Sequence, residues 1–319
     1  MINEILKEIG SIKNKDDKEL FKQLKVYLSG EKLENSIKSL WDSRENNKIA
    51  IQHKYPNLIK QMSFFALLLM DINYFKDASY KEKKEKAKIK YRYNVSAALY
   101  NKSLQTFLDV FGLLVNGSVS STFLLWRSIY ENFVISKYLV NSTEEEANLF
   151  NDYEIIQRYK LIGKKPTKEE REVYVKKFGR DFETNDYCWA KSLRGKKTFL
   201  KVVRSIKENK LFKFYLLSAY QGHSSSFTVN KGFEYHENSS DINRIGFYPD
   251  EVTKSLNAFI AVMSEFANLM VDNYVDDKKS RETLKKLVLY YGKEIDKKWK
   301  KYQEKTAAGA SGQVTKIKK

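Results

Sequence analysis

The chain contains very few residues that break helices. Its 319 residues include only 3 prolines and 13 glycines, and both residue types interrupt or weaken a helix when they occur inside it. No segment alternates apolar and polar residues for long enough to indicate a half-buried strand. We therefore predict an all-α fold, an irregular multi-helix bundle with long core helices.

The composition divides the chain into four regions. Residues 1–54 carry short amphipathic patterns and are expected to form a peripheral helical region, and residues 55–277 are expected to form the helical core. A basic helix is predicted over 278–305, followed by a disordered basic tail over 306–319 that has few apolar residues to bury. One long loop is predicted at about 223–249, and long loops in compact domains are often functional.

Caps and periodicity place the helices of the core. Pro56 is expected to begin a helix that runs through Phe75, because proline suits the first helical turn. The following helix is predicted to be continuous over 79–117. "NSTEEE" at 141–146 is an N-terminal capping signal for a helix that runs to Ile162. Further helices are predicted over about 118–140, 166–178, 196–208, 210–221 and 249–275, with an irregular stretch at 180–195.

The charge balance favours an anionic partner. The formal net charge is +18 and the sequence pI is about 9.5, and such a field attracts nucleic acid or anionic surfaces. A compositional bias towards Lys, Asn, Ile and Tyr would give the same balance without any binding function. Both interpretations remain open.

The sequence predicts a cytoplasmic protein without membrane insertion. The longest uncharged run, 110–126, has Asn, Gly and Ser at its centre, and the apolar run 64–70 is too short to span a bilayer. The N-terminus lacks the apolar core of a signal peptide. A single cysteine, Cys188, fits a reducing compartment.

Arg127 and Glu131 form the first candidate constellation. They lie four residues apart in the predicted helix 118–140 and therefore share one face of it. Apolar neighbours such as Leu124 and Tyr130 suggest a desolvated ion pair, whose disruption would cost about 3–5 kcal/mol. The pair is either a structural bridge between helices or an anchor that orients a neighbour such as His223.

His223 is one of only three histidines and directly follows Gly222 at a predicted helix end. One interpretation is a helix C-cap, in which a protonated imidazole interacts favourably with the helix dipole. The other is a general acid or base. No histidine pairs with another or with Cys188 at zinc-ligand spacing, and glycine motifs for phosphate or dinucleotide binding are absent. We expect neither a metal nor a cofactor.

Basic and aromatic residues are candidates for nucleic-acid contacts. Lys88 and Arg92 belong to "KEKKEKAKIKYRY" at 81–93, where cations can neutralise phosphates and rings can stack on unpaired bases. A solvated helix face would show the same pattern.

The order of several motifs resembles DUF5677, a bacterial family of unknown function. The motifs lie within about 95–275 and read "LLWRSIYENFVISKYL", "FNDYEIIQRYK", "DYCWAKSL" and "FYLLSAYQGH". The resemblance implies a helical fold and a role in phage defence or abortive infection. A looser analogy is to the helical HEPN ribonucleases, although this chain lacks their Arg–His motif within one helix. The family pattern falls on Arg127, Glu131, Trp189, Tyr215, Ser218 and His223.

We therefore expect a cytoplasmic protein of a phage-defence or stress response that binds RNA, rather than DNA, and is a candidate metal-independent ribonuclease. His223 would transfer the proton, Arg127 would stabilise the developing phosphorane charge, and Glu131 would orient Arg127. The alternative is a non-enzymatic protein-interaction module whose Arg–Glu–His cluster is structural. A protein partner or a homo-oligomer is compatible with either. The candidate substrate-binding residues are Tyr220, Ser218, Trp189, Tyr215, Lys88 and Arg92.

Overall fold

The computed structural model describes residues 55–83, 86–116, 122–208, 210–222 and 249–314, together with separate positions between 34 and 53. The chain divides into two compact units, one of residues 1–56 and 115–117 and one of residues 57–114 and 118–319. Nearly all described residues belong to the second unit, which is considered by itself.

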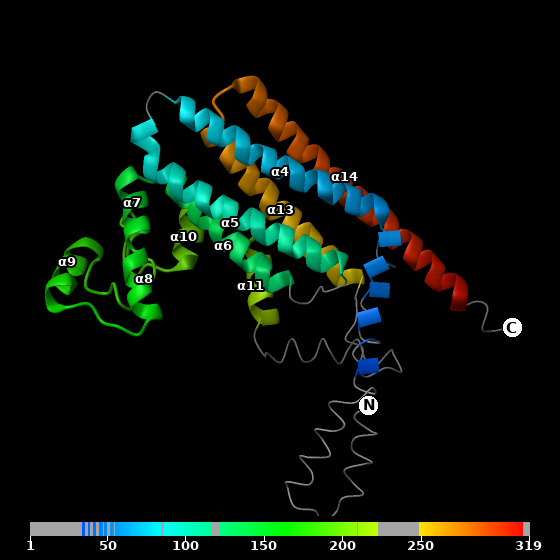
Figure 1. The fold of residues 1–319 in the computed structure, drawn as a ribbon, viewed down its shortest axis with the longest axis horizontal. Coiled ribbons are helices and arrows are strands. Elements are labelled where there is room, and N and C mark those ends of the chain that lie inside the picture. The colour runs from blue at the N-terminus through cyan, green and yellow to red at the C-terminus, as the bar shows by residue number, and fades with distance from the viewer. Residues whose placement is uncertain are drawn as a thin grey trace, which may run out of the picture. The chain divides into compact units, whose positions relative to one another are not determined.

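The described part of this unit is helical and contains no strand (Figure 1), which confirms the predicted all-α fold. The long loop predicted at about 223–249 lies outside the described residues as far as 248. The elements are α4 (Pro56–Glu82), the 3-10 helix η1 (Lys86–Ile89), α5 (Lys90–Val115), α6 (Thr122–Val140), α7 (Glu144–Asp152), α8 (Glu154–Leu161), α9 (Lys168–Phe178), α10 (Phe199–Ser205), α11 (Phe212–Gly222), α13 (Pro249–Tyr274) and α14 (Lys278–Val314).

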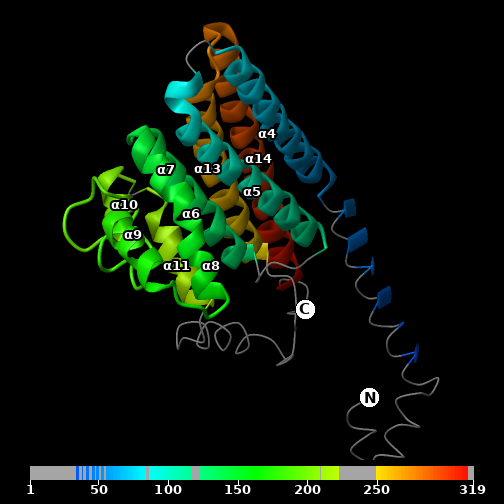
Figure 2. The same ribbon diagram turned by 60° about the vertical axis from the view of Figure 1, so that its left-hand side comes forward.

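Helix α6 lies at the centre of the packing. It packs against α13, α11 and α10, and the side chains of Trp126, Ile129, Tyr130 and Phe133 are buried. Figures 1 and 2 show the long helices α4, α5, α13 and α14 alongside α6, and the shorter helices α7 to α11 gathered on one side. Each large apolar side chain buried in this way contributes about 1.5–3 kcal/mol.

Edge-to-face aromatic contacts join the long helices. Phe65 of α4 meets Phe107 of α5 with ring centroids 5.9 Å apart. Phe266 of α13 meets both Tyr100 of α5, at 5.2 Å, and Phe133 of α6, at 5.7 Å. Such pairs contribute about 0.5–1.5 kcal/mol beyond the area that they bury, so the four helices form one continuous core.

The break between α4 and α5 differs from the prediction of one helix over 79–117. Helix α4 continues to Glu82, and α5 begins only at Lys90, after η1. The sequence between them, "KEKKEKAK" at 81–88, places lysines three and four residues apart. Opposite charges occur at the same spacings, as in Glu82 and Lys86, so repulsion between lysines does not by itself account for the break.

Two other helix boundaries also differ from those predicted. The helix predicted to run to Ile162 is divided into α7 and α8 at Tyr153, whose buried hydroxyl donates a hydrogen bond to the Phe182 carbonyl (2.9 Å). Helix α14 continues past residue 305 to Val314. Alanines are strong helix formers, and this extension contains Ala307, Ala308 and Ala310.

The irregular segment between α9 and α10 is held in place by buried groups. The indole Nε1 of Trp189 donates to the Asp186 carbonyl (2.9 Å), and its ring meets Phe150 edge to face at 4.8 Å. The buried carboxylate of Glu146 accepts hydrogen bonds from the Tyr138 hydroxyl (2.6 Å) and from the backbone N–H of Ser192 (3.0 Å). One carboxylate therefore ties α6, α7 and the irregular segment together.

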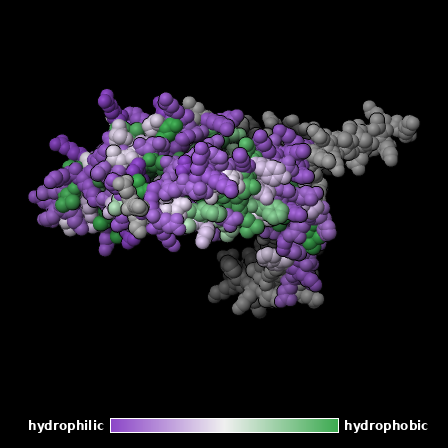
Figure 3. Space-filling model, turned by 90° about the horizontal axis from the view of Figure 1, so that it is seen from above, coloured by the Kyte–Doolittle hydropathy of each residue, from purple (hydrophilic) through white to green (hydrophobic). Residues whose placement is uncertain are grey.

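Helix α4 presents an apolar face to solvent. Figure 3 shows hydrophobic side chains gathered between hydrophilic ones over this helix. Among the described residues, α4 is the one helix long and apolar enough to span a membrane, a criterion that buried helices of soluble proteins also meet. Its opposite face belongs to the core, with Phe65, Leu69 and Ile72 fully buried. The exposed residues are Phe64, Leu67, Met70, Tyr74 and Phe75, which are 40–72% exposed.

Glu146→Ala removes the acceptor shared by Tyr138 and Ser192. We expect the free energy of unfolding to fall by about 1–3 kcal/mol, because buried donors lose their partner. Urea denaturation measures this loss. Glu154→Ala is the control, since Glu154 forms an exposed pair with Arg158 at 2.7 Å that contributes at most about 0.5 kcal/mol. Equal losses in the two variants would contradict the structural role of Glu146.

Candidate functional site

One stripe of α6 is left partly uncovered by the neighbouring helices. It includes Leu124, Ser128 and Ile135, which are exposed or half-buried. Arg127 and Glu131 lie on the same stripe, with side chains 36% and 34% exposed. The packing of α6 therefore places both charged groups where solvent and a ligand can reach them.

Tyr215 of α11 completes a triad with these two residues. Arg127 Nε donates to Glu131 Oε1 (2.9 Å), and Arg127 Nη2 donates to the Tyr215 hydroxyl (2.9 Å). The Tyr215 hydroxyl in turn donates to Glu131 Oε1 (3.0 Å). Arg127 Cζ also lies 4.8 Å from the centroid of the Tyr215 ring. The third guanidinium nitrogen, Nη1, has no hydrogen-bond acceptor among the described residues.

The triad fixes the charge state of its members. The hydrogen bond that Arg127 donates to Glu131 raises the pKa of Arg127, so the guanidinium stays cationic. Burial, and then the charge of Glu131, raise the pKa of Tyr215 to about 12. The Tyr215 hydroxyl is therefore protonated at neutral pH and does not act as a general base. Because both ions are about a third exposed, loss of one partner costs about 1 kcal/mol or less rather than the about 3–5 kcal/mol expected for a buried pair.

Aromatic rings surround Tyr215. Its ring lies 5.0 Å from Phe199 at the start of α10 and 5.5 Å from Tyr130 of α6, between ring centroids. Tyr187 of the irregular segment approaches Phe199 at 6.2 Å, and burial raises the pKa of Tyr187 above its usual value. The hydroxyl of Tyr130 is buried without a hydrogen-bond partner among the described residues. Three separate elements thus supply rings next to the triad.

The other residues assigned from the family pattern have different positions. Ser218 is buried, and its hydroxyl donates back to the Tyr215 carbonyl within α11 (2.7 Å). Trp189 is buried in the packing of the irregular segment. Tyr220 lies in α11, but its side chain is outside the described residues, and so is His223. No group of three or more His, Cys, Asp or Glu side chains that could hold a metal ion occurs in the described part of the chain.

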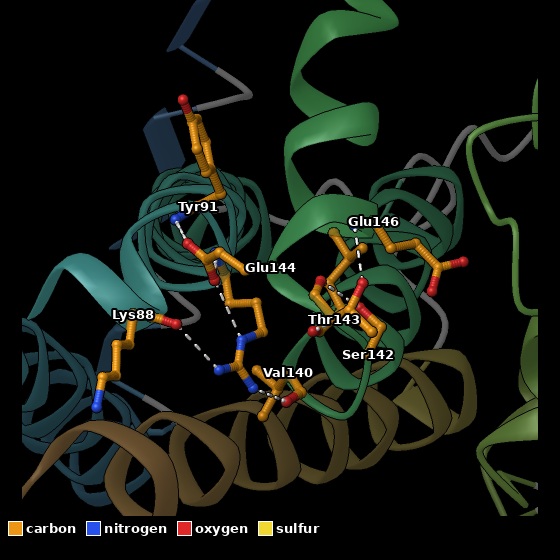
Figure 4. Close-up of polar contacts among 9 residues, drawn as sticks. Lys88, Tyr91, Val140, Ser142, Thr143, Glu144 and Glu146 are labelled. Atoms are coloured by element: carbon orange, nitrogen blue, oxygen red, sulfur yellow. Dashed lines mark hydrogen bonds and ion pairs between the residues drawn. The ribbon is translucent and has the colours of Figure 1, made fainter. Parts of the chain in front are cut away.

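Arg92 is engaged with the protein itself. Its Nε donates to Glu144 Oε2 (3.2 Å), and its terminal nitrogens donate to the carbonyls of Val140 and Lys88 (both 3.4 Å). In Figure 4 the labelled Tyr91, at the start of α5, lies close to Glu144 and Val140, at the turn that joins α6 to α7. Val140 is thirteen residues along α6 from Arg127, about 20 Å at the rise of an α-helix. Arg92 therefore fastens helix ends and does not belong to the triad.

A strongly basic segment next to the triad was missed by the sequence reasoning. Residues 191–213 contain nine Lys and Arg residues but only one acidic residue, Glu208. Glu208 is buried, and its carboxylate accepts a hydrogen bond from Lys137 of α6 (3.1 Å). Of the nine cations, only Lys210 has a carboxylate within ion-pair distance among the described residues, Glu265 at 3.6 Å. A count of charges along the chain would have revealed this segment.

In this helical fold the central helix α6 presents an Arg–Glu pair that a tyrosine of the later helix α11 completes. Residues 93–241 match the model of the family described as "Family of unknown function (DUF5677)". This match confirms the resemblance to DUF5677 over residues 93–241 but gives no support to the HEPN analogy. The match begins at Tyr93 within α5, extends past the end of α11 and includes every position assigned from the family pattern. No curated protein and no solved structure matches the chain.

Tyr215→Phe removes the shared hydroxyl and keeps the ring. We expect the free energy of unfolding to fall by about 0.5–1.5 kcal/mol at pH 9. A free tyrosine has a pKa of about 10, whereas that of Tyr215 is about 12 in the folded protein. Between pH 10 and pH 12 the unfolded chain loses the Tyr215 proton while the folded protein keeps it. The contribution of the Tyr215 hydroxyl to the free energy of unfolding of the wild type therefore decreases as the pH rises.

The difference in stability between wild type and Tyr215→Phe should therefore narrow from pH 9 to pH 11, as measured by urea denaturation. Tyr290→Phe is the control, because Tyr290 is 55% exposed on α14. A difference that stays constant or widens for Tyr215→Phe would show that its hydroxyl is not held protonated by the triad.

Proposed function

We propose that the protein binds single-stranded RNA on a surface formed by the basic segment 191–213 and the triad of Arg127, Glu131 and Tyr215. The observation that carries this proposal is the nearly uncompensated positive charge of the segment. Its one carboxylate, Glu208, is turned inward to Lys137. Cations without acidic partners can neutralise successive phosphates of a strand.

The rings beside the basic segment favour a single strand over a duplex. Phe199 belongs to the segment and lies against Tyr215, and Tyr187 lies against Phe199. Unpaired bases stack on such rings, at about 1–3 kcal/mol per base. In a duplex the bases are stacked on one another and are not available for this contact.

Arg127 supports the same proposal as an anchor for one phosphate. Its Nε and Nη2 are fixed by Glu131 and Tyr215, while Nη1 points to no acceptor in the described part of the chain. A guanidinium that is already oriented loses less conformational freedom when it binds a phosphate oxygen. Glu131 and Tyr215 are thus positioning residues for Arg127.

Cleavage of the bound RNA is a second candidate function. It is favoured by Arg127, which is about a third exposed and whose charge could stabilise a phosphorane-like transition state. Tyr215 is protonated at neutral pH, so another group would have to accept the proton. The sequence assigns that role to His223.

The alternative of a non-enzymatic interaction module is favoured because the hydrogen bonds of the triad run mainly among its own three members. Each of the three side chains hydrogen-bonds to the other two, as in a structural bridge between α6 and α11. In that case the triad would join the helices, and its charges would be dispensable for binding.

We place the protein in the cytoplasm and in a phage-defence or stress response. The family resemblance supports the response, and the single cysteine, Cys188, which is buried and free, supports a reducing compartment. Phage challenge of cells with and without the gene tests this setting. Equal plating efficiency on both would speak against it.

The triple variant Lys191→Ala, Lys196→Ala and Arg204→Ala tests the RNA-binding surface. Removing three phosphate contacts should weaken binding of a labelled single-stranded RNA and reduce the slope of log affinity against log salt by about two. Fluorescence anisotropy across a salt series measures both quantities. The matched control replaces Lys278, Lys279 and Lys286, three exposed lysines of α14, with alanine.

The control has the same change in charge and should keep the wild-type slope. Equal losses in the two triple variants would remove the assignment of the surface to residues 191–213. Absence of RNA binding by the wild-type protein at low salt would remove the proposed function, and equal affinity for single-stranded DNA would remove the preference for RNA.

Cleavage is tested by incubating the protein with end-labelled RNA in excess chelator. Arg127→Lys keeps the positive charge but cannot make the same forked contact, and His223→Asn removes the proposed proton carrier. Each should slow cleavage by about 10²-fold or more while the melting temperature changes little. Wild-type protein that binds RNA but leaves it intact would reject the ribonuclease and keep the binding proposal.

A further inference from the structure

A small cavity that includes no residue of the triad lies between α8, the loop that joins α8 to α9, and the irregular segment. Its volume is about 160 Å³. The lining is mainly apolar, with Ile156 and Phe182 buried and therefore at its floor. Tyr159 and Pro166 form its sides, and the exposed Lys164 and Lys165 lie at its mouth.

The walls of this cavity are fixed before any ligand binds. The Tyr159 hydroxyl donates to Glu170 Oε1 (2.9 Å), and Glu170 is itself held by a reciprocal capping box with Thr167. The Phe182 carbonyl accepts a hydrogen bond from the buried Tyr153 hydroxyl. A preformed site avoids the entropic cost of ordering side chains on binding.

The mouth of the cavity carries an excess of positive charge. Lys160, which also lines it, is paired with Asp186 (2.6 Å), and the acidic lining residue, Glu183, is paired with Arg171 (3.2 Å). Lys164 and Lys165 have no acidic partner among the described residues. The two charges that remain uncompensated are thus both cations, and both lie at the opening.

The size and lining together indicate the ligand. An apolar cavity of about 150 Å³ holds one six-membered ring, and flat apolar walls with Tyr159 and Phe182 suit an aromatic one. Lys160 Nζ has three N–H groups and donates two of them, to Asp186 and Tyr153. The third N–H can meet a carbonyl oxygen on the edge of the ring.

We propose that this cavity binds the base of a pyrimidine nucleotide, with the nucleotide phosphate on Lys164 and Lys165. The single ring fits the volume, the carbonyl of the base fits the donor of Lys160, and the two free lysines fit a phosphate. The nucleotide is either free or a residue of RNA. In the second case the inference rests on the proposed function and names the base that the protein prefers.

The test titrates the full-length protein with UMP, CMP, AMP and ribose 5-phosphate by isothermal calorimetry. UMP and CMP should bind saturably, and AMP and ribose 5-phosphate should bind at least about tenfold more weakly, since one has too large a base and the other has none. Equal affinity for ribose 5-phosphate would reduce the site to a phosphate contact and overturn the proposal. So would the absence of pyrimidine nucleotide binding.

Lys164→Ala with Lys165→Ala should weaken UMP binding by about tenfold or more, the loss of one charge-assisted hydrogen bond. The control pair is Lys176→Ala with Lys286→Ala, two exposed lysines that do not line the cavity. Both pairs are at the surface and should keep the wild-type melting temperature. Unchanged UMP affinity in the first pair, or an equal loss in the control, would overturn the assignment.

Competition distinguishes the two sources of nucleotide and separates this inference from the proposed function. Displacement of UMP by oligouridylate, but not by oligoadenylate, assigns the cavity to RNA; displacement by neither assigns it to a free nucleotide. If the triple variant in segment 191–213 loses RNA binding and the wild-type protein does not bind UMP, the proposed function is kept and the assignment of the cavity to a pyrimidine nucleotide is overturned. If the wild-type protein binds UMP but not RNA, the assignment of the cavity is kept and the proposed function is overturned.

Discussion

Helix α6 is buried on most of its circumference, and this burial determines which of its positions can hold ionic side chains. A helix that packs against α13, α11 and α10 can place ionic side chains on the stripe that those helices leave open, or where a partner compensates the charge, as Glu208 does for Lys137, because an unpaired buried charge is strongly destabilising. Arg127 and Glu131 occupy that stripe. Helix α11 then crosses close enough for Tyr215 to reach both, so one packing arrangement creates the core and orients the triad.

The fold uses several carboxylates as internal acceptors, and this changes the charge that its surface presents. Glu144 accepts from Arg92, Glu146 from Tyr138 and a backbone amide, and Glu208 from Lys137. Each of these carboxylates joins segments that are distant in the sequence. As a result, acidic groups that appear to balance nearby lysines in the sequence do not balance them at the surface, and segment 191–213 is left positive.

Local signals in the sequence were sufficient for most of the helices. The scarcity of breakers indicated the all-α fold, and the capping signal at 141–146 corresponds to Thr143, whose side chain accepts from the Glu146 amide (3.2 Å). The spacing of Arg127 and Glu131 placed them on one face, because helical neighbours are set by sequence separation alone.

Long-range contacts could not be read in the same way. Tyr215 meets Arg127 across 88 positions of the chain, and Arg92 meets Glu144 across 52, and no pattern within a single helix contains these pairings. Arg92 was assigned to phosphate binding because its local neighbours are lysines. Its partner instead comes from the cap region of α7, which only the tertiary fold brings to it.

The apolar face of α4 gives the molecule two opposite responses to dissolved ions. Simple electrolytes screen the lysines of the basic segment, whereas ions at the kosmotropic end of the Hofmeister series, such as sulfate, strengthen contacts between apolar surfaces. Chloride and sulfate at the same ionic strength are therefore not equivalent solvents for this protein. In sulfate, the screening of these lysines is accompanied by a growing tendency of Phe64, Leu67 and Met70 to leave water, so a helix outside segment 191–213 favours salting-out.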